Sequence, residues 1–484
     1  MKEADILLIY PPYSYPKKSP PLGLAYIASV LEKEGYSVKI LDMSVLDMPY
    51  RNLGKEISFS KPKVVGISFM TNQYKDAVIV SKIIKNVDAN IQVIVGGPHV
   101  SALPEEIVSL NSVDVAVIGE GERTMLELVD NILNRDNSNF ETISGIAYKK
   151  DGNVFINPRR ELIKDLDSIP FPAWHLLPLH KYSVPATGAD AAKSVFAILS
   201  SRGCPYQCVF CDSYTIFGRK FRGRSAQNIF DELQYLNEIF NATQFDFVDD
   251  TITIDKDRIY KLCNLILSSN LQIKWMCNAR VDTVNLEMLQ MMNKAGCARI
   301  EFGVESGDEE VLKRIKKGIK INEIKTAHKM ARKAGMSIGS FVMVGNLGED
   351  FSSIIKTKEL LKEIDTDDVY ISIATPFPGT ELYKIANNNG WLKVQDWSKY
   401  VTAPTYLPNY QPIMETDKMK SYEILKAFFY LHSQFAGRKF QTRYGNAFFI
   451  KPRFYKEVVL SVKNWRDIKH KIKLAKELIT NYFH

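Results

Sequence analysis

The stretch RGCPYQCVFCD, residues 202–212, places three of the chain's six cysteines within eight positions. These are Cys204, Cys208 and Cys211, and they follow an apolar, strand-like run at 194–201. The sequence therefore predicts that the three thiols stand together on the loop that leaves a strand. Thiolates at such close spacing on one loop can point at a single metal centre.

An iron–sulfur cluster fits this spacing better than a zinc site or a disulfide. Structural zinc usually takes four ligands, which typically come from two separated pairs. A disulfide would leave one of the three thiols over and is rare in a reducing compartment. Three thiolates would leave one iron of a 4Fe–4S cluster open to a substrate or cofactor. We therefore predict such a cluster, with Cys204, Cys208 and Cys211 as its ligands.

The Cys-x-x-x-Cys-x-x-Cys spacing, with Phe210 directly before the third cysteine, resembles the motif of the radical S-adenosylmethionine superfamily. The resemblance implies that the open iron binds the amine and carboxylate of S-adenosylmethionine, and that Phe210 belongs to this cofactor site. It also implies that the reduced cluster cleaves S-adenosylmethionine to methionine and a 5′-deoxyadenosyl radical. Such a radical removes hydrogen from carbon atoms that acid–base chemistry does not reach.

The residues after the cysteines alternate between strand-like and helix-like runs. The strand-like runs are 245–254, 273–281, 298–306, 337–345 and 369–377. With 194–201 they predict a partial (β/α)6 barrel, whose active site lies at the carboxyl ends of the strands.

Polar residues mark two of those strand ends. In the resembled superfamily the ends of the second and fourth strands contact S-adenosylmethionine, which implies this role for Asp249, Glu305 and Ser306. The alternative is that Asp249 and Glu305 cap the helices that follow them. The sequence assigns no catalytic side chain.

The first 145 residues alternate in the same way. Strand-like runs lie at 4–10, 36–42, 63–68, 91–97 and 113–121. Apolar strands separated by helices predict a flavodoxin-like parallel sheet covered on both faces, with ligands at the carboxyl ends of the strands. A dinucleotide site is disfavoured, because the first strand runs into YPPYSYP rather than a GxGxxG turn.

These strand ends resemble the cobalamin-binding domain in order and spacing. Ser68 follows the third strand and Gly96-Gly97 follow the fourth, as in that family. Ser44 stands where the family carries the histidine that binds cobalt, so this turn supplies the metal with no imidazole. The resemblance implies a cobalamin site formed by Ser44, Ser68, Gly96, Gly97, Gly119 and Glu120. The alternative is a domain that binds another ligand or none.

The chain is thus expected to be α/β and to have four parts. They are a cobalamin-binding domain at 1–143, a hairpin and linker at 144–194, the barrel at 195–390 and a mainly helical C-terminal segment at 391–484. The last part either covers the barrel and lines a substrate pocket or packs as a helical tail.

Composition bounds the partners. The net charge is +8 and the basic residues are spread along the chain, which disfavours a nucleic-acid partner. No run approaches the ~18 apolar residues of a membrane span, and the N-terminus lacks a signal-peptide pattern, so a cytoplasmic location is expected. Cys263, Cys277 and Cys297 have no cluster spacing and are expected to be small buried residues.

Both resemblances together imply a cobalamin-dependent radical S-adenosylmethionine enzyme. The stretches 302–318, 347–350 and 375–383 resemble the branch with an N-terminal cobalamin domain. The leading hypothesis is C-methylation of an unactivated carbon of a small-molecule or lipid-like substrate, with flavodoxin or ferredoxin as electron donor. The first alternative is oxidative cyclisation or another carbon-skeleton bond formation, as in the anaerobic chlorophyll-ring cyclases. The second is a cobalamin-binding sensor or carrier with a silent barrel.

Overall fold

A computed structural model describes residues 4–13, 19–134, 140–182, 195–403 and 410–435 of the chain. By its internal contacts the chain divides into two compact units. Unit 1 comprises Met1–Pro185, Ala191–Ile273 and Thr375–Met414, and unit 2 comprises Ala186–Asp190, Lys274–Ala374 and Glu415–His484. Both units combine parallel strands with helices, so the predicted α/β class is confirmed.

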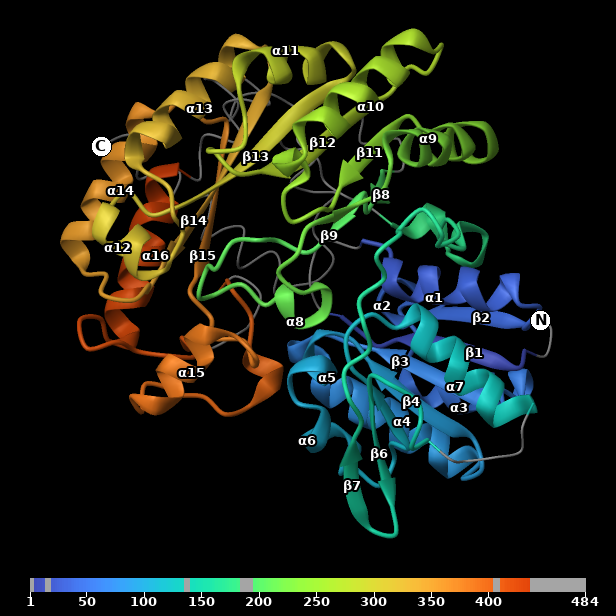
Figure 1. Cartoon of the computed structure of the whole chain (residues 1–484). Coiled ribbons are helices and arrows are strands. Elements are labelled where there is room, and N and C mark those ends of the chain that lie inside the picture. Colours follow the sequence, from blue (N-terminus) through green and yellow to red (C-terminus); the bar gives the residue numbers. More distant parts are fainter. Residues whose placement is uncertain (1–3, 14–18, 135–139, 183–194, 404–409, 436–484) are drawn as a thin grey trace, which may run out of the picture. The chain divides into compact units, whose positions relative to one another are not determined.

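Unit 1 begins with a sheet of seven described strands, in the order β2-β1-β3-β4-β5-β6-β7 (Figure 1). Strands β1 to β5 run parallel, and their order 2-1-3-4-5 is that of flavodoxin-like folds. The strands are β1 (Ile6–Tyr10), β2 (Val38–Asp42), β3 (Val64–Ser68), β4 (Gln92–Gly96), β5 (Val115–Val117), β6 (Ile146–Lys150) and β7 (Asn153–Ile156).

Helices cover this sheet on both faces because its strands are apolar on both. Leu7, Val65 and Val93 pack into one core with residues of α3 and α4. On the other face, a Cβ at Gly66 would lie 3.3 Å from the methyl carbon of Met125 in α7, so that helix lies close to the sheet. The helices are α1 (Leu22–Lys33), α2 (Met43–Leu46), α3 (Tyr50–Ser60), α4 (Tyr74–Val87), α5 (Pro98–Ala102), α6 (Pro104–Val108) and α7 (Glu122–Asn134).

The hairpin β6–β7 extends the same sheet, because β6 pairs antiparallel with β5. Its turn holds Asp151 and Gly152 at φ values of 51° and 79°. Two positive φ values in succession are those of the tight hairpin turn that Asp-Gly favours.

The remainder of unit 1 holds the first strands of the predicted barrel. Strands β8 and β11 are parallel, and the two-residue strands β9 and β10 pair antiparallel. Strand β11 ends earlier than the sequence predicts, and Ile252–Ile254 form a 3₁₀ turn instead. The elements are β8 (Phe196–Ile198), β9 (Ser201–Arg202), α8 (Tyr214–Phe217), β10 (Arg222–Gly223), α9 (Ala226–Phe240), β11 (Gln244–Phe247), α10 (Lys256–Ser268) and α15 (Glu381–Asn388).

Unit 2 carries four parallel strands in the order β15-β14-β13-β12, with helices between them in sequence. Side chains of Asn285, Asp308 and Asp350 accept backbone N–H groups and so cap α11, α12 and α14. The elements are β12 (Lys274–Ala279), α11 (Leu286–Lys294), β13 (Cys297–Glu305), α12 (Glu309–Arg314), α13 (Ile321–Lys333), β14 (Ser337–Val344), α14 (Phe351–Glu363), β15 (Asp368–Ile373) and α16 (Ser421–Phe435).

The predicted helical C-terminal segment is described only in part. Helix α16 belongs to it, whereas 436–484 lie outside the described residues. Within the described ranges, no helix combines the length and the apolar character that a membrane crossing requires.

Candidate functional site

The three cysteines stand on one loop between β9 and α8, as the sequence predicts. The loop is closed at its base, because Arg202 of β9 pairs with Arg222 of β10. Gly203 starts the loop at φ 82°, and a Cβ there would lie 2.4 Å from the carbonyl oxygen of Lys220. Only glycine fits this position, because the backbone at the start of the cysteine loop runs too close to the backbone of Lys220 to leave room for a side chain.

None of the three described cysteines of this loop takes part in a disulfide. Cys208 is buried, whereas Cys204 and Cys211 are partly exposed, and Phe210 is half-buried beside Cys211. Burial raises the pKa of the Cys211 thiol to about 12. In the described part of the chain, no three His, Cys, Asp or Glu side chains stand in an arrangement that already forms a metal site. The chemistry of the donor set still fits an iron–sulfur cluster, since three cysteines outside any disulfide share one loop and two of them are partly exposed.

Asp249 is predicted to contact S-adenosylmethionine, and the structure places its carboxylate among serines. Ser200 donates its hydroxyl to Oδ1 at 2.9 Å and its backbone N–H to Oδ2 at 3.2 Å, and Ser201 also donates to Oδ1. The side chain is only 1% exposed. These contacts tie the end of β11 to the segment between β8 and β9.

The neighbouring Asp250 also lies beside the cysteine loop, although the sequence assigned it no role in the site. It is exposed, and its Oδ2 accepts the hydroxyl hydrogen of Ser213, two residues after Cys211. The sequence shows two adjacent carboxylates and no signal for which one faces the loop. Asp250 is therefore a residue that the sequence prediction missed.

Glu305 and Ser306 close β13 in unit 2. Glu305 adopts a φ of 63°, which a residue with a side chain rarely takes and which is common at functional sites. Its Oε1 accepts a hydrogen bond from Nζ of Lys317 at 2.8 Å, and both side chains are buried. Ser306 is fully buried, and its hydroxyl accepts the N–H of Asp308 at 3.2 Å. Lys317 is a second residue that the sequence prediction missed.

Glu349 lies beside the end of β14 and is fully buried. Its Oε2 accepts the backbone N–H groups of Gly345 and Asn346 at 2.6 and 3.1 Å. Its Oε1 has no hydrogen-bond partner among the residues described. Burial raises the pKa of this carboxyl from 4.5 to about 7.

This pKa predicts a pH dependence of stability. The unfolded chain releases the Glu349 proton near pH 4.5 and the folded chain only near 7, so the folded state loses stability as the pH rises between these values. The variant Glu349→Gln stays neutral. Its unfolding free energy should therefore rise relative to wild type across this window, by at most on the order of 3 kcal/mol. Melting temperatures of both proteins against pH measure the effect, and a difference that does not change with pH would contradict it.

A cavity of about 330 Å³ opens at the carboxyl ends of β1, β3, β4 and β5 in unit 1. Five of the six residues predicted to bind cobalamin line it, namely Ser68, Gly96, Gly97, Gly119 and Glu120. The lining also includes Arg202, which precedes the cysteines, and Ile216 and Phe217, which follow them. The glycine-rich strand ends and residues that flank the cysteine loop therefore share one cavity.

Ser44, the sixth predicted residue, is not among the residues that line this cavity. Its N–H and hydroxyl donate to Oδ1 of Asp42 at 3.0 and 2.6 Å, and the phenol of Tyr182 donates to Oδ2 at 2.9 Å. Burial raises the pKa of Asp42. Ser44 thus completes a buried turn with Asp42 and Tyr182.

Two features of the cavity test whether it fits a bound cofactor. Gly97 has a φ of 105°, and a Cβ there would lie 2.6 Å from the carbonyl oxygen of Phe69. Glycine therefore allows the ends of β3 and β4 to approach each other here more closely than any side chain would permit. Glu122 lines the same cavity, and its Oε2 is buried with no partner among the described residues. A cavity wall of strand-end glycines with this unpartnered acceptor suits a ligand that carries amide donors, as cobalamin does.

His99 follows Gly97 on α5 but does not line the cavity. Its ring is fully buried among Phe69, Tyr74 and Trp397, and its Nδ1 lies 3.3 Å from Oγ1 of Thr71. Burial lowers the pKa of this imidazole to about 4, so the ring is neutral near pH 7.

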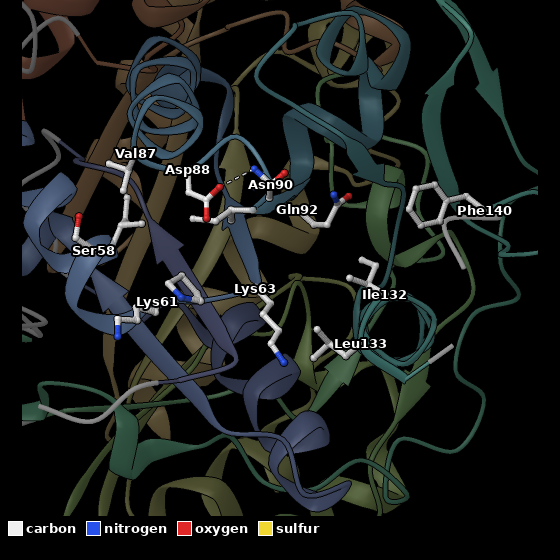
Figure 2. A pocket seen from close by; sticks show the side chains of 13 residues that line it. Ser58, Lys61, Lys63, Val87, Asp88, Asn90, Gln92, Ile132, Leu133 and Phe140 are labelled. Carbon is white, nitrogen blue, oxygen red and sulfur yellow. Dashed lines mark hydrogen bonds between the residues drawn. The ribbon is translucent and has the colours of Figure 1, made fainter. Parts of the chain in front are cut away.

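A larger cavity of about 650 Å³ opens at the amino ends of β3 and β4 (Figure 2). It contains none of the predicted site residues. Figure 2 shows Lys61 and Lys63 with Asp88 and Asn90 around it, and the Asn90 N–H donates to Asp88 at 2.9 Å. Parallel sheets bind ligands at the carboxyl ends of their strands, so the smaller cavity is the better candidate.

Two family models match the chain. The Radical SAM superfamily matches residues 198–386, and the B12 binding domain matches residues 14–129. An uncharacterized methyltransferase of Pyrococcus horikoshii is 36% identical over 434 residues, covering 88% of this chain and 91% of that protein. The cytidylyl-2-hydroxyethylphosphonate methyltransferase of Streptomyces wedmorensis is 28% identical and covers 79% of this chain and 81% of its own. The anaerobic magnesium-protoporphyrin IX monomethyl ester cyclase of Rubrivivax gelatinosus is 28% identical, with coverages of 84% and 72%.

Solved structures share the fold. The radical S-adenosylmethionine methyltransferase TsrM from Kitasatospora setae, with cobalamin and a 4Fe–4S cluster bound, superposes with a TM-score of 0.71 at 15% identity, covering 88% of this chain and 91% of that one. OxsB, with aqua-cobalamin and S-adenosylmethionine bound, gives 0.74 at 18% identity, with coverages of 99% and 72%. The predicted cofactors are confirmed as a 4Fe–4S cluster, S-adenosylmethionine and cobalamin. The chain belongs to the family of radical S-adenosylmethionine enzymes with a cobalamin-binding domain.

Proposed function

We propose that this enzyme transfers a methyl group to an unactivated carbon of a small-molecule or lipid-like substrate. The observation that carries the proposal is the 330 Å³ cavity, which is lined by the strand ends of the cobalamin-binding domain together with residues of β9 and α8 that flank the cysteine loop. The bound cofactors supply a carbon radical and a methyl group. Residues of this chain hold the two cofactor sites side by side, which suits a reaction that needs both.

The turn after β2 supports methyl transfer further. It holds Ser44 instead of a histidine, and Tyr182 and Ser44 satisfy the carboxylate of Asp42. His99 is enclosed by aromatic rings and lies off the cavity wall. We infer that neither the turn after β2 nor His99 gives the cobalt an imidazole, and a cobalt face without such a ligand suits a metal that gives up a methyl group repeatedly.

The site residues are proposed accordingly. Cys204, Cys208 and Cys211 hold the cluster. Phe210, Asp249, Glu305 and Ser306 are the candidates for S-adenosylmethionine, with Asp250 and Lys317 added because they stand beside the cysteine loop and Glu305 respectively. A flavodoxin or ferredoxin would supply the electrons, and a cytoplasmic location would suit this partner.

A second candidate is oxidative cyclisation. The 28% identity with the cyclase of Rubrivivax gelatinosus favours it. The 36% identity with a protein named as a methyltransferase favours methylation over it. The third possibility, a sensor or carrier with a silent barrel, is disfavoured by the intact cysteine triad.

Measuring the two products formed from S-adenosylmethionine, S-adenosylhomocysteine and 5′-deoxyadenosine, distinguishes between these functions. With a substrate pool from the native organism, methylation should give S-adenosylhomocysteine and 5′-deoxyadenosine in equal amounts, because one molecule donates the methyl group and another the radical. Leaving out cobalamin should remove the first product. Deoxyadenosine without S-adenosylhomocysteine, together with a product lighter by two hydrogens, would establish the cyclase instead. Formation of neither would favour the sensor or carrier.

A further inference from the structure

A buried group of ion pairs joins the cavity of unit 1 to both ends of the cysteine loop. We name it the Glu120 network, and it consists of Glu120, Glu122, Arg202 and Arg222. Arg202 of β9 stands directly before the cysteine loop, and Arg222 of β10 follows the short helix α8 that ends the loop. All four side chains are buried, with exposed fractions of 8% or less. Buried charges at such positions must be paired, because an unpaired charge away from water is strongly destabilising.

Glu120 is the centre of the network. Its Oε1 accepts hydrogen bonds from Arg202 at 3.0 Å and from Arg222 at 2.8 Å. Its Oε2 accepts the backbone N–H of Ile163 at 2.8 Å. Glu122 accepts a further hydrogen bond from Arg202 at 2.6 Å. The carboxylate of Glu120 is thus engaged by the protein, and its contact with cobalamin stays a prediction.

The same network forms part of the cavity wall. Glu120, Glu122 and Arg202 line the cavity, as do Ile216 and Phe217 at the end of the loop. Arg222 donates to the carbonyl oxygen of Phe217 at 2.9 Å, and the Arg202 guanidinium lies 5.6 Å from the centre of the Phe217 ring. The positions of the loop ends and the shape of the cavity are therefore set by one group of contacts.

We propose that Glu120 is a positioning residue that couples cobalamin binding in the cavity to cluster binding on the cysteine loop. A cluster on the three cysteines would restrict the conformations of the loop. Through Arg202 and Arg222, the Glu120 network would then restrict the residues of the cavity wall as well. Coupling of this kind is reciprocal, so each cofactor strengthens the binding of the other by the same factor. The inference rests on the two cofactor sites assigned above and does not depend on the reaction.

The test compares cobalamin affinity with and without the cluster, using the full chain under anaerobic conditions. Wild-type protein with a reconstituted cluster should bind hydroxocobalamin more tightly than the cluster-free protein, by about 5- to 150-fold, which is the usual range of coupling between sites. In Glu120→Gln the ratio of the cobalamin affinities with and without the cluster should fall to about one, because the neutral amide no longer holds both guanidinium groups.

The matched control is Glu232→Gln. Glu232 is also fully buried and forms a buried ion pair with Arg224, but it does not line the cavity. This variant should lose stability while keeping the wild-type ratio. Equal ratios in the two variants would overturn the proposal, as would a wild-type ratio of one or a lack of cobalamin binding in every form.

Amide hydrogen exchange gives a second test, whose result would not change with cobalamin if Glu120 served only the stability of the fold. The N–H groups of Phe217 and Gly218 bond to Ser213 and Tyr214 at 3.0 and 3.1 Å. Cobalamin should slow their exchange in wild type and leave it unchanged in Glu120→Gln. If that variant does not fold, Glu122→Gln, which removes the second charged partner of Arg202, tests the same coupling. A preserved ratio with no methylated product would refute the proposed methylation and leave the coupling intact.

Discussion

Replacing Cys204, Cys208 and Cys211 together by alanine should reduce the iron and sulfide of the reconstituted protein to the level of a blank. Formation of 5′-deoxyadenosine should stop completely, because no other thiols stand on this loop. Iron and sulfide assays, with the absorbance of the cluster, measure the first effect, and chromatography of the nucleosides measures the second. This is the largest effect that we expect from any substitution in the chain.

The chain offers a matched control for this variant. Cys263, Cys277 and Cys297 are all at most 1% exposed and lie on α10, β12 and β13, away from the cysteine loop in sequence. Replacing these three by alanine should lower the melting temperature through lost packing, while the cluster and the deoxyadenosine remain. Substantial iron and sulfide in the loop variant would refute the ligand assignment.

Gly97→Ala should weaken cobalamin binding by about 10- to 100-fold, since 1.4 kcal/mol corresponds to a factor of ten. The added methyl would lie 2.6 Å from the Phe69 carbonyl oxygen, so the cavity wall must shift. The φ of 105° is also strained for any residue with a side chain. Titration of cobalamin by absorbance or fluorescence quenching gives the affinity.

Gly145→Ala separates this effect from general strain. Gly145 also has a positive φ, of 77°, and a Cβ there would meet Arg160 at 3.1 Å, but the residue does not line the cavity. Both variants should be less stable than wild type, and only Gly97→Ala should lose affinity. Equal affinities in the two variants would show that the ligand does not approach Gly97.

The sequence predicted those features that are set locally. The cysteine loop, the glycines at the strand ends and the alternation of strands and helices in the N-terminal part depend on spacing and on apolar runs, which the chain itself displays. Ser68, Gly96, Gly97, Gly119 and Glu120 could be placed at one cavity because parallel strands bring their carboxyl ends to one edge.

Features that depend on distant partners could not be predicted. The sequence suggests a strand through 245–254, but β11 ends at Phe247, so side-chain alternation gives no guide to Asp249 and Asp250. Serines some fifty residues earlier bury Asp249. In the same way, the partners of Glu120 lie 82 and 102 positions away in the sequence. No local pattern identifies a pairing over such separations.

The short ladder between β9 and β10 has a consequence for how this part of the protein tolerates change. The pairing of Arg202 with Arg222 holds together the two ends of the segment 203–221, which contains the cysteines. The number of residues in this segment can therefore change without moving the strands on either side. Residues inserted between Cys211 and Arg222 would lengthen a loop that is already closed, and each doubling of a loop adds only about 0.6 kcal/mol of closure entropy. We therefore expect insertions and deletions in this segment to change the surroundings of the cluster while the positions of the barrel strands stay the same.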